Sequence, residues 1–353
     1  MNDPTAPESA VENIDSGVWS IRVPMPRHPL RASLCYAYVA EDGTATVIDP
    51  GWPTEESWTA LVDGLRAIGA DPARVDQILL THGHRDHSGL AGRLAKVSGA
   101  RVRLHREDRE MLVPKGAAHG ERVRHWLALA GVDDTDSLAA ASLLPALPPF
   151  PDQVSAPGFV HDGDVVSVPG GELVVHWTPG HTPGHVCFED AGRGLLFTGD
   201  HVLPRISPNV STMVGHRASA LTDYLESLGK VARLAVSRVL PGHERHFTDI
   251  AARVDALFVH HRRRLDEILV VLADRSPHTT LELARELTWS RRWDEIKGLQ
   301  QRAALGEVLS HLHFLHDVGA VDMDAENIPL TWRIIRPDAL AEAWGAAGYP
   351  GAA

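Results

Sequence analysis

Residues 81–89 read Thr-His-Gly-His-Arg-Asp-His-Ser-Gly, a stretch with three histidines and one aspartate between positions 82 and 87. It overlaps the end of the apolar segment VDQILLTH, residues 75–82, which is typical of a buried strand. Side chains on a turn can converge on one point, whereas those on a straight strand alternate between two faces. Imidazole nitrogens and carboxylate oxygens are the ligands that zinc, manganese and iron take in proteins. The stretch therefore predicts a metal site on a turn at a strand end.

Later segments repeat this arrangement with one ligand-type residue each. TPGHTPGH carries His181, FTGD carries Asp200 and LPGHE carries His243, each in a glycine-containing turn after an apolar strand. Earlier in the chain, the apolar segment TATVIDPG ends at Asp49 and a Pro-Gly turn. Any one of these residues alone would be an ordinary turn residue. Because His181, Asp200 and His243 follow strands in the same way, these three together strengthen the prediction of one site.

The segments around these residues alternate between strand and helix patterns. Apolar residues at helical spacing from Trp58 to Ile68 predict a helix before the strand at 75–82, and another helix precedes a strand at 101–105. Residues 106–158 interrupt the alternation, and we interpret them as an insertion that covers part of the molecule. The alternation resumes from 165 to 243, which predicts two sheet halves with helices outside them.

The chain changes character after about residue 255. Helical patterns dominate and lead into a strand-like segment, LTWRII, which suggests a separate small domain of winged-helix type over residues 256–340. Residues 260–336 hold eleven basic and twelve acidic side chains, a net charge of −1. The basic run Arg262–Arg264 is short, and we interpret it as a solvated helix face.

Composition limits the classes of function. The 353 residues include 34 Lys and Arg against 46 Asp and Glu, so a net charge of −12 argues against a protein that mainly grips phosphate backbones. The two cysteines, Cys35 and Cys187, cannot form a disulfide framework, which favours a reducing cytoplasm. The polar N-terminal segment does not have the pattern of a signal peptide, and no apolar run approaches the ~20 residues of a membrane span. We expect a cytoplasmic protein without a membrane partner.

The ordered set of strand-end residues resembles the metallo-β-lactamase superfamily of hydrolases. That pattern is an aspartate after an early strand, then HxHxDH, then single His, Asp and His residues at later strand ends. Here these positions hold, in order, Asp49, then His82, His84, Asp86 and His87, then His181, Asp200 and His243. The resemblance covers roughly residues 16–250. It implies an αββα sandwich with the site at one edge of the two sheets, and a catalytic domain over residues 16–255.

The resemblance also implies roles for these side chains around two divalent metal ions, zinc or alternatively manganese or iron. His82, His84 and His181 would bind one ion, Asp86, His87 and His243 the other, and Asp200 would bridge them. Asp86 and Asp200 would be the catalytic carboxylates, and Asp49 and His185 would support the ligands without binding metal.

Asp200 stands where the best-known zinc β-lactamases have cysteine. The resemblance is therefore to the glyoxalase-II-like and phosphodiesterase-like branches. Cys187 we interpret as a buried strand residue. A hydroxide bridging two ions would attack the substrate, so the reaction class is metal-assisted hydrolysis.

The substrate remains open at this point. We favour a thioester or another ester-like small molecule, and the alternatives are a ribonuclease or phosphodiesterase with a nucleic-acid-binding tail, a lactonase, or a non-catalytic metal-binding scaffold. His201, Arg205 and Asn209 follow a ligand closely and could contact substrate, or could form an ordinary polar loop. The proline-rich segment 141–158 could form one wall of the cleft. The C-terminal domain could shape the opposite wall or a homodimer contact.

Overall fold

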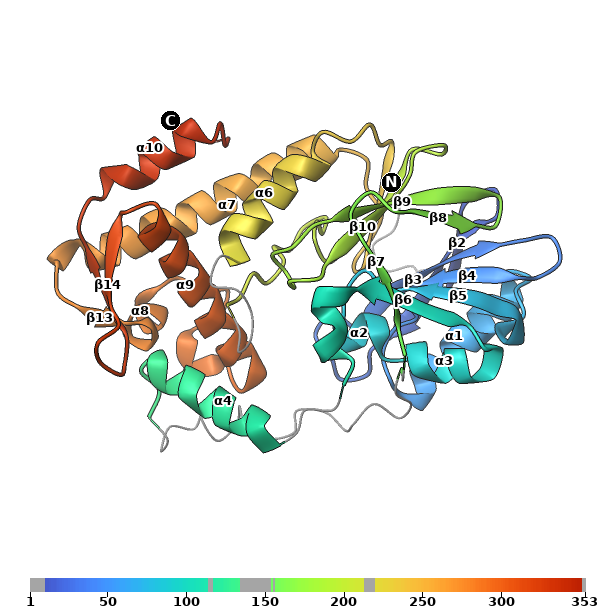
Figure 1. Cartoon of the computed structure of the whole chain (residues 1–353), viewed down its shortest axis with the longest axis horizontal. Coiled ribbons are helices and arrows are strands. Elements are labelled where there is room, and N and C mark those ends of the chain that lie inside the picture. The colour runs from blue at the N-terminus through green and yellow to red at the C-terminus, as the bar shows by residue number, and fades with distance from the viewer. Residues whose placement is uncertain (1–9, 114–116, 134–153, 155, 213–219, 351–353) are drawn as a thin grey trace.

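The fold is seen in a computed structural model of the chain, which describes residues 10–113, 117–133, 154, 156–212 and 220–350 (Figure 1). Two stacked sheets form one half of the molecule. The first has seven strands that lie in sequence order, β1 (Val11–Asp15), β2 (Val18–Pro24), β3 (Ala32–Val39), β4 (Ala45–Ile48), β5 (Val75–Leu79), β6 (Arg101–His105) and β7 (Gly158–Val160). The second has the order β12 (Arg238–Pro241), β11 (Leu195–Gly199), β10 (Val186–Asp190), β9 (Gly171–Trp177) and β8 (Val165–Val168).

The strand directions explain why polar turns gather at one edge. Strands β4 to β7 pair in parallel, and β11 pairs in parallel with β12. The other neighbouring strands of these two sheets pair antiparallel. The carboxyl ends of parallel strands meet at one edge of a sheet, which is where open α/β sheets place their ligands.

Strand β3 shows how the sequence specifies two buried faces. Leu34, Tyr36 and Tyr38 belong to the apolar cluster between the sheets, together with Phe188 and Phe197 of the second sheet. The alternate residues Cys35 and Ala37 belong instead to the cluster beneath the outer helices. Because both faces are covered, the segment is nearly continuously apolar rather than alternating with polar residues.

Helices cover the outer face of each sheet (Figure 1). Helix α1 (Glu55–Ala67) begins at Thr54, whose side chain accepts a hydrogen bond from the Ser57 amide, and it packs Leu61 and Leu65 on the first sheet. Helix α3 (Ala91–Ser98) covers the same face, and α6 (Ala220–Val231) packs on the second sheet. The predicted αββα sandwich is confirmed.

The C-terminal half consists of helices and a small sheet. Its elements are α7 (Ile250–Val271), β13 (His278–Thr279), α8 (Thr280–Glu286), α9 (Leu299–Asp317), β14 (Val321–Asp324), β15 (Thr331–Ile334) and α10 (Asp338–Ala346). The sheet is antiparallel with the order β13-β15-β14. The helical C-terminal region is therefore present, and its winged-helix type stays a prediction. The domain boundary that we placed at residue 255 falls inside α7.

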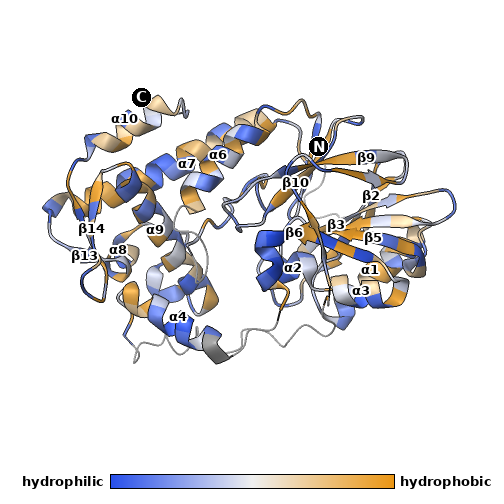
Figure 2. Ribbon diagram, viewed as in Figure 1, coloured by the Kyte–Doolittle hydropathy of each residue, from blue (hydrophilic) through white to orange (hydrophobic). Residues whose placement is uncertain are grey.

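One apolar cluster joins the C-terminal half to the second sheet. It contains Leu196 of β11, Tyr224 of α6, Leu257 of α7 and Trp344 of α10. Figure 2 shows the apolar residues that run along the strands and along α6. Helix α4 (Ala117–Leu129), from the segment that we interpreted as an insertion, contributes Trp126 to this cluster. The two halves therefore share a continuous core.

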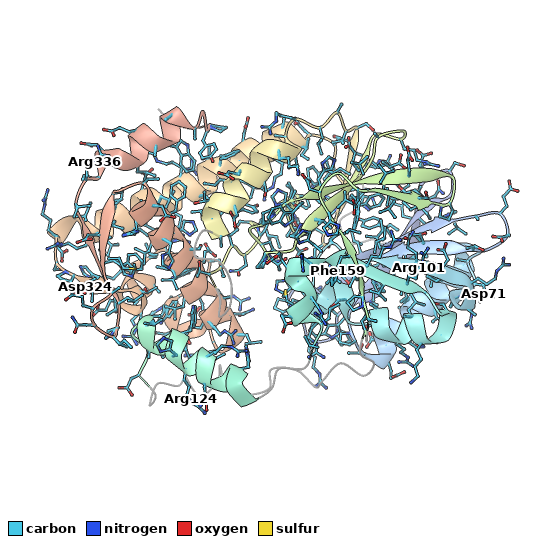
Figure 3. The ribbon with its side chains drawn as sticks, in the orientation of Figure 1. Asp71, Arg101, Arg124, Phe159, Asp324 and Arg336 are labelled. Atoms are coloured by element: carbon cyan, nitrogen blue, oxygen red, sulfur yellow. The ribbon has the colours of Figure 1, made fainter. Side chains whose placement is uncertain are left out.

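Part of the interpretation of residues 106–158 can be examined. Residues 106–111 form a short 3₁₀ helix, η2 (Arg106–Met111), and α4 lies against the C-terminal half, where Figure 3 labels Arg124. The Leu129 carbonyl accepts a hydrogen bond from the Leu330 amide. Most of the proline-rich segment 141–158, for which we predicted a wall of the cleft, lies outside the described residues.

Several interpretations of the sequence can now be compared with the structure. Arg263 is exposed, but Arg262 and Arg264 are half-buried and ion-paired, with Asp266 at 3.0 Å and Glu267 at 2.7 Å, so only part of the basic run is a solvated face. Cys187 is a buried residue of β10, as predicted, and both cysteines are free.

The sequence patterns did not indicate β1, β7 or α10. Among the described residues, no helix is long and apolar enough to cross a membrane.

Candidate metal centre

Polar side chains from five strand ends meet at one edge of the two sheets. Asp49 follows β4, His82 follows β5, His181 follows β9, Asp200 follows β11 and His243 follows β12. The remaining three lie on or next to α2 (Arg85–Ser88), a single helical turn that begins at His84 and carries Asp86 and His87. That turn redirects the chain after β5, so that side chains close in sequence point to two different groups.

The first group contains only imidazoles. His82 Nε2 lies 3.0 Å from His84 Nδ1, which lies 2.9 Å from His181 Nε2. We call His82, His84 and His181 the imidazole trio. Three ligand nitrogens around a tetrahedral zinc ion, at about 2.0–2.1 Å from it, are separated by roughly 3.3 Å. The trio therefore has nearly the spacing that a zinc ion requires.

The second group combines two imidazoles with two carboxylates. His243 Nε2 lies 3.2 Å from Asp86 Oδ2 and 3.5 Å from Asp200 Oδ1, and His87 Nε2 lies 3.4 Å from the same Asp200 oxygen. We call Asp86, His87, Asp200 and His243 the mixed quartet. The other Asp200 oxygen, Oδ2, lies 3.7 Å from His181 Nε2 of the trio. Asp200 therefore presents one oxygen to each group.

The ring nitrogens that face away from these groups have partners of their own. His82 Nδ1 lies 3.0 Å from Thr81 Oγ1, and His87 Nδ1 lies 2.9 Å from Asp49 Oδ2. His181 Nδ1 is 2.8 Å from the Asn209 carbonyl and His243 Nδ1 is 2.9 Å from the Ala32 carbonyl, each as a donor. Such partners fix the tautomer and orientation of a metal-binding histidine. They leave the inward nitrogen free to bind.

Electrostatics keeps His82 and His84 of the trio neutral. Burial, followed by the neighbouring imidazoles His87 and His84, holds the pKa of His82 well below its usual value. Burial and His181 lower the pKa of His84 to about 3. Close neighbouring imidazoles and burial both disfavour a proton on His82 and His84. At neutral pH these two rings already carry the lone pairs that a metal ion needs.

The quartet has the opposite electrostatics. Burial alone would lower the pKa of His243, but the Asp200 and Asp86 carboxylates outweigh burial and raise it to about 10. The same carboxylates raise the pKa of His87 against burial. Burial alone would raise the pKa values of Asp86 and Asp200, yet His87 and His243 hold both below the usual range. Without a metal ion, these groups therefore neutralise one another as ion pairs.

Polar atoms without partners show that a cation fits. His87 Nε2, His243 Nε2 and Asp200 Oδ1 are buried, and none has a hydrogen-bond partner. A buried polar atom without a partner costs about 1–3 kcal/mol, so this convergence calls for an explanation. Imidazole nitrogens and carboxylate oxygens within 4.8 Å of one another are the donor set of zinc and related divalent ions. The residues present fit such ions.

The His185 side chain supports Asp200 by contacting the Asp200 backbone amide. Its Nε2 accepts a hydrogen bond from the Asp200 amide at 3.2 Å, and its Nδ1 lies 2.9 Å from Thr178 Oγ1. The turn before His243 packs tightly against His87, because a Cβ atom added at Gly242 would lie 2.4 Å from His87 Cε1. The predicted supporting positions of Asp49 and His185 thus lie directly behind the two groups.

The three residues predicted to contact substrate lie around the site in different ways. His201 is fully buried beside Tyr224, so it offers no surface to a substrate in this structure. Arg205 is 70% exposed and pairs with Glu244 at 2.9 Å. Asn209 acts through its carbonyl on His181, while its side chain contacts Ser211 and the Ala303 carbonyl.

Sequence reasoning missed several residues at the site. Thr81 links Asp49 to His82, because its hydroxyl donates to Asp49 Oδ2 at 2.6 Å. Asp108 is completely buried beneath two of the ligand loops. His28 and Trp52 form a half-buried ring pair, with centroids 5.6 Å apart, on segments adjoining those that hold His243 and His87. Asp108 follows a strand, so the strand-end argument could have found it.

Comparisons with known proteins agree with this arrangement. The sequence model of the family described as "Metallo-beta-lactamase superfamily" matches residues 28–243. A probable metallo-hydrolase of Bacillus subtilis, YqjP, is 26% identical over 278 residues, which cover 76% of this chain and 84% of that protein. The match extends beyond the two sheets, since it covers more of the chain than the family model does.

Two solved structures share most of this fold. A metallo-beta-lactamase family protein from Thermus thermophilus is 30% identical, with a TM-score of 0.78, over 92% of this chain and 100% of that chain. A beta-lactamase domain protein from Burkholderia ambifaria is 27% identical, with a TM-score of 0.75, over 94% of this chain and 96% of that chain. These likenesses include the C-terminal half.

Proposed function

This chain belongs to the metallo-β-lactamase superfamily, and on that premise we propose that it is a hydrolase that uses two divalent metal ions on an ester-like small molecule. The imidazole trio would hold one ion. Asp86, His87 and His243 would hold the other, and Asp200 would bind both. Zinc fits the donor set best, and manganese or iron are alternatives.

One observation carries the proposal of two ions. The two oxygens of Asp200 face different groups, with Oδ1 3.4–3.5 Å from the quartet imidazoles and Oδ2 3.7 Å from His181 of the trio. Seven donor residues exceed the four positions of one tetrahedral ion. The three partnerless atoms all lie in the quartet, so an ion there would engage them, and the trio supplies a separate set of donors for a second ion.

The chain's own residues then have separable roles. Bound divalent ions lower the pKa of water from 15.7 to about 7 and polarise the bond to be cleaved. His82 and His84 would bind an ion without losing protons, whereas His87 and His243, whose pKa values are raised, would each have to release one. Asp49 accepts from His87 Nδ1 and so keeps the Nε2 lone pair directed into the quartet. No serine or cysteine nucleophile is required.

For the substrate, we propose a thioester or a related ester, with a lactone as the nearest alternative. The net charge of −12 and the C-terminal net charge of −1 support an organic substrate over a nucleic acid. Arg262 and Arg264 are engaged by Asp266 and Glu267, so they offer few free charges to a phosphate backbone. The ribonuclease proposal is weakened accordingly, and a pairing of two copies through the C-terminal helices stays a prediction.

A substrate panel tests the proposal. Purified protein would be assayed with added zinc or manganese against acyl-CoA thioesters, lactones, a phosphodiester and single-stranded RNA. We expect metal-dependent turnover of a thioester or lactone that stops with a chelator and returns when metal is restored. Cleavage of RNA alone would replace the proposed substrate class, and no metal-dependent hydrolysis of any member would contradict the enzyme assignment.

A further inference from the structure

A buried carboxylate lies directly beneath the imidazole trio, although it faces neither metal group. Asp108 belongs to η2, just after β6, and its side chain is completely buried. It lies in the segment that the sequence patterns indicated to be an insertion. Its position therefore gives the start of that segment a part in the site.

Asp108 accepts hydrogen bonds from two different loops. Its Oδ2 accepts from the Gly83 amide at 2.8 Å and from the Thr182 hydroxyl at 2.7 Å, and its Oδ1 accepts from the Gly184 amide at 2.7 Å. Gly83 stands between His82 and His84, and Thr182 follows His181 directly. One side chain thus binds both loops that carry the trio.

The fit around this carboxylate is close. A Cβ on Gly184 would lie 2.7 Å from Asp108 Oδ1, and a Cβ on Gly83 would lie 2.6 Å from Met111 Cβ of the same η2 helix. Real Cβ atoms do not approach so closely, so both positions require glycine. The two loops are therefore held against η2 by contact as well as by hydrogen bonds.

We infer that Asp108 is a positioning residue that sets the distance between the His82–His84 loop and the His181 loop, and thereby the affinity of the imidazole trio for its metal ion. The inference rests on the proposed metal centre. A ligand set binds tightly only when its atoms are held at coordination distance, and partners behind the ligands contribute 10–100-fold to metal affinity. The quartet has no hydrogen bond to Asp108 among the described contacts, so the effect is specific to the trio.

Asparagine is the most informative replacement. All three groups facing Asp108 are donors, so the amide nitrogen of Asp108→Asn must point at one of two backbone amides that cannot turn away. One loop would lose its anchor while the shape of the side chain is kept. Thr182→Val removes only the hydroxyl donor and provides a milder version of the same change.

Cobalt binding, measured one group at a time, tests the inference. In a His243→Ala background the trio would be titrated by its visible absorption, and in a His84→Ala background the quartet would be titrated. We expect Asp108→Asn to weaken cobalt binding about 10–100-fold in the first background, Thr182→Val to weaken it about 3–10-fold, and neither to change the second.

Asp190→Asn serves as a matched control. Asp190 is a buried carboxylate that accepts three hydrogen bonds, one from Tyr38 and two from Arg193, at 2.9–3.0 Å. We expect it to lower the melting temperature without changing either cobalt affinity. If Asp108→Asn does no more than this control while the parent chain binds two ions, the positioning role is wrong. A parent chain that binds no cobalt would overturn the metal centre itself, and this inference with it.

Discussion

The imidazole trio and the mixed quartet lie side by side, share the Asp200 carboxylate, and differ in charge. The trio has no carboxylate of its own, and His84 has a pKa lowered to about 3 by burial and His181. The quartet pairs two carboxylates with two imidazoles, and His243 has a pKa raised to about 10 against its burial. The trio is therefore ready to receive a cation, whereas the quartet must first give up protons. Two adjacent groups of histidines thus present different chemistry because of their neighbours.

The largest effect is expected where the two groups meet. Asp200→Ala removes the side chain whose two oxygens face both groups, so we expect hydrolysis to fall to background and the content of both metal ions to drop. Elemental analysis of metal-replete protein should give about two ions per chain for the parent and fewer than one for the variant. Circular dichroism checks that the fold is kept. Wild-type turnover and metal content would show that Asp200 does not join the groups.

The next largest difference between the groups should be the number of protons that each releases when it binds metal. The raised pKa values of His87 and His243 favour their protonated forms, and each must lose its proton to bind metal. Quartet affinity should therefore rise with pH, about a hundredfold per unit for two displaced protons, whereas trio affinity should depend less on pH because the pKa values of His82 and His84 are lowered. Calorimetry in buffers of different ionisation enthalpy measures the protons directly, in His84→Ala and His243→Ala backgrounds for the quartet and trio respectively.

In the His84→Ala background both quartet imidazoles remain, so about two protons should be released on binding. The trio should release fewer protons, because the pKa values of His82 and His84 are lowered. Equal proton release in the two backgrounds would contradict the electrostatic difference between the groups.

A buried carboxylate lies behind each group, Asp108 behind the trio and Asp49 behind His87 of the quartet. Replacing each in turn shows which group it supports. Asp49 accepts from the Thr81 amide at 2.8 Å, the Thr81 hydroxyl at 2.6 Å and His87 Nδ1 at 2.9 Å. We expect Asp49→Asn to weaken quartet binding about 10–100-fold through His87 and trio binding less, through Thr81 and His82, so the larger effect falls on the other group than for Asp108→Asn. Cobalt titration in the same two single-group backgrounds measures it. Weakening confined to the trio would mean that the supports are assigned the wrong way round.

The same contrast explains what could be predicted from the sequence. The residues of the two groups follow strand ends directly or lie on or next to α2, the helical turn after β5, so local patterns were sufficient to predict that they gather, and the structure brings them together. Their metal-binding roles stay predictions. The αββα arrangement was predictable for a similar reason, because strands such as β3 are apolar on both faces and the helices between strands are amphipathic.

The partners behind the ligands were harder to predict. His181 and His243 are oriented by the carbonyls of Asn209 and Ala32, and a backbone carbonyl leaves no trace in the residue type. Asn209 drew attention for its side chain, yet its carbonyl makes the contact with the ligand. The burial of His201 beside Tyr224 also depends on how α6 packs, which no local pattern reveals.

The smallest effect should come from the C-terminal half, which contacts residues 209–212 next to the trio. Residues 209–212 lie on α9, because the Ser310 hydroxyl donates to the Val210 carbonyl at 2.6 Å and the Thr212 amide donates to the Gly306 carbonyl at 3.0 Å. The Asn209 carbonyl of this segment orients His181. Ser310→Ala removes the hydrogen bond to the Val210 carbonyl, which is worth about 1 kcal/mol. Part of that loss should loosen His181, so we expect the affinity of the trio for cobalt to fall two- to fivefold.

Ser98→Ala, which removes a serine hydroxyl bonded to a helix carbonyl on α3, is the control and should leave cobalt affinity unchanged. If Ser310→Ala lowers the melting temperature but leaves the trio's affinity at the parent value, the C-terminal half does not reach the metal centre through α9. The trio would then be positioned by its own half of the molecule, as the quartet is by Asp49 and the Ala32 carbonyl.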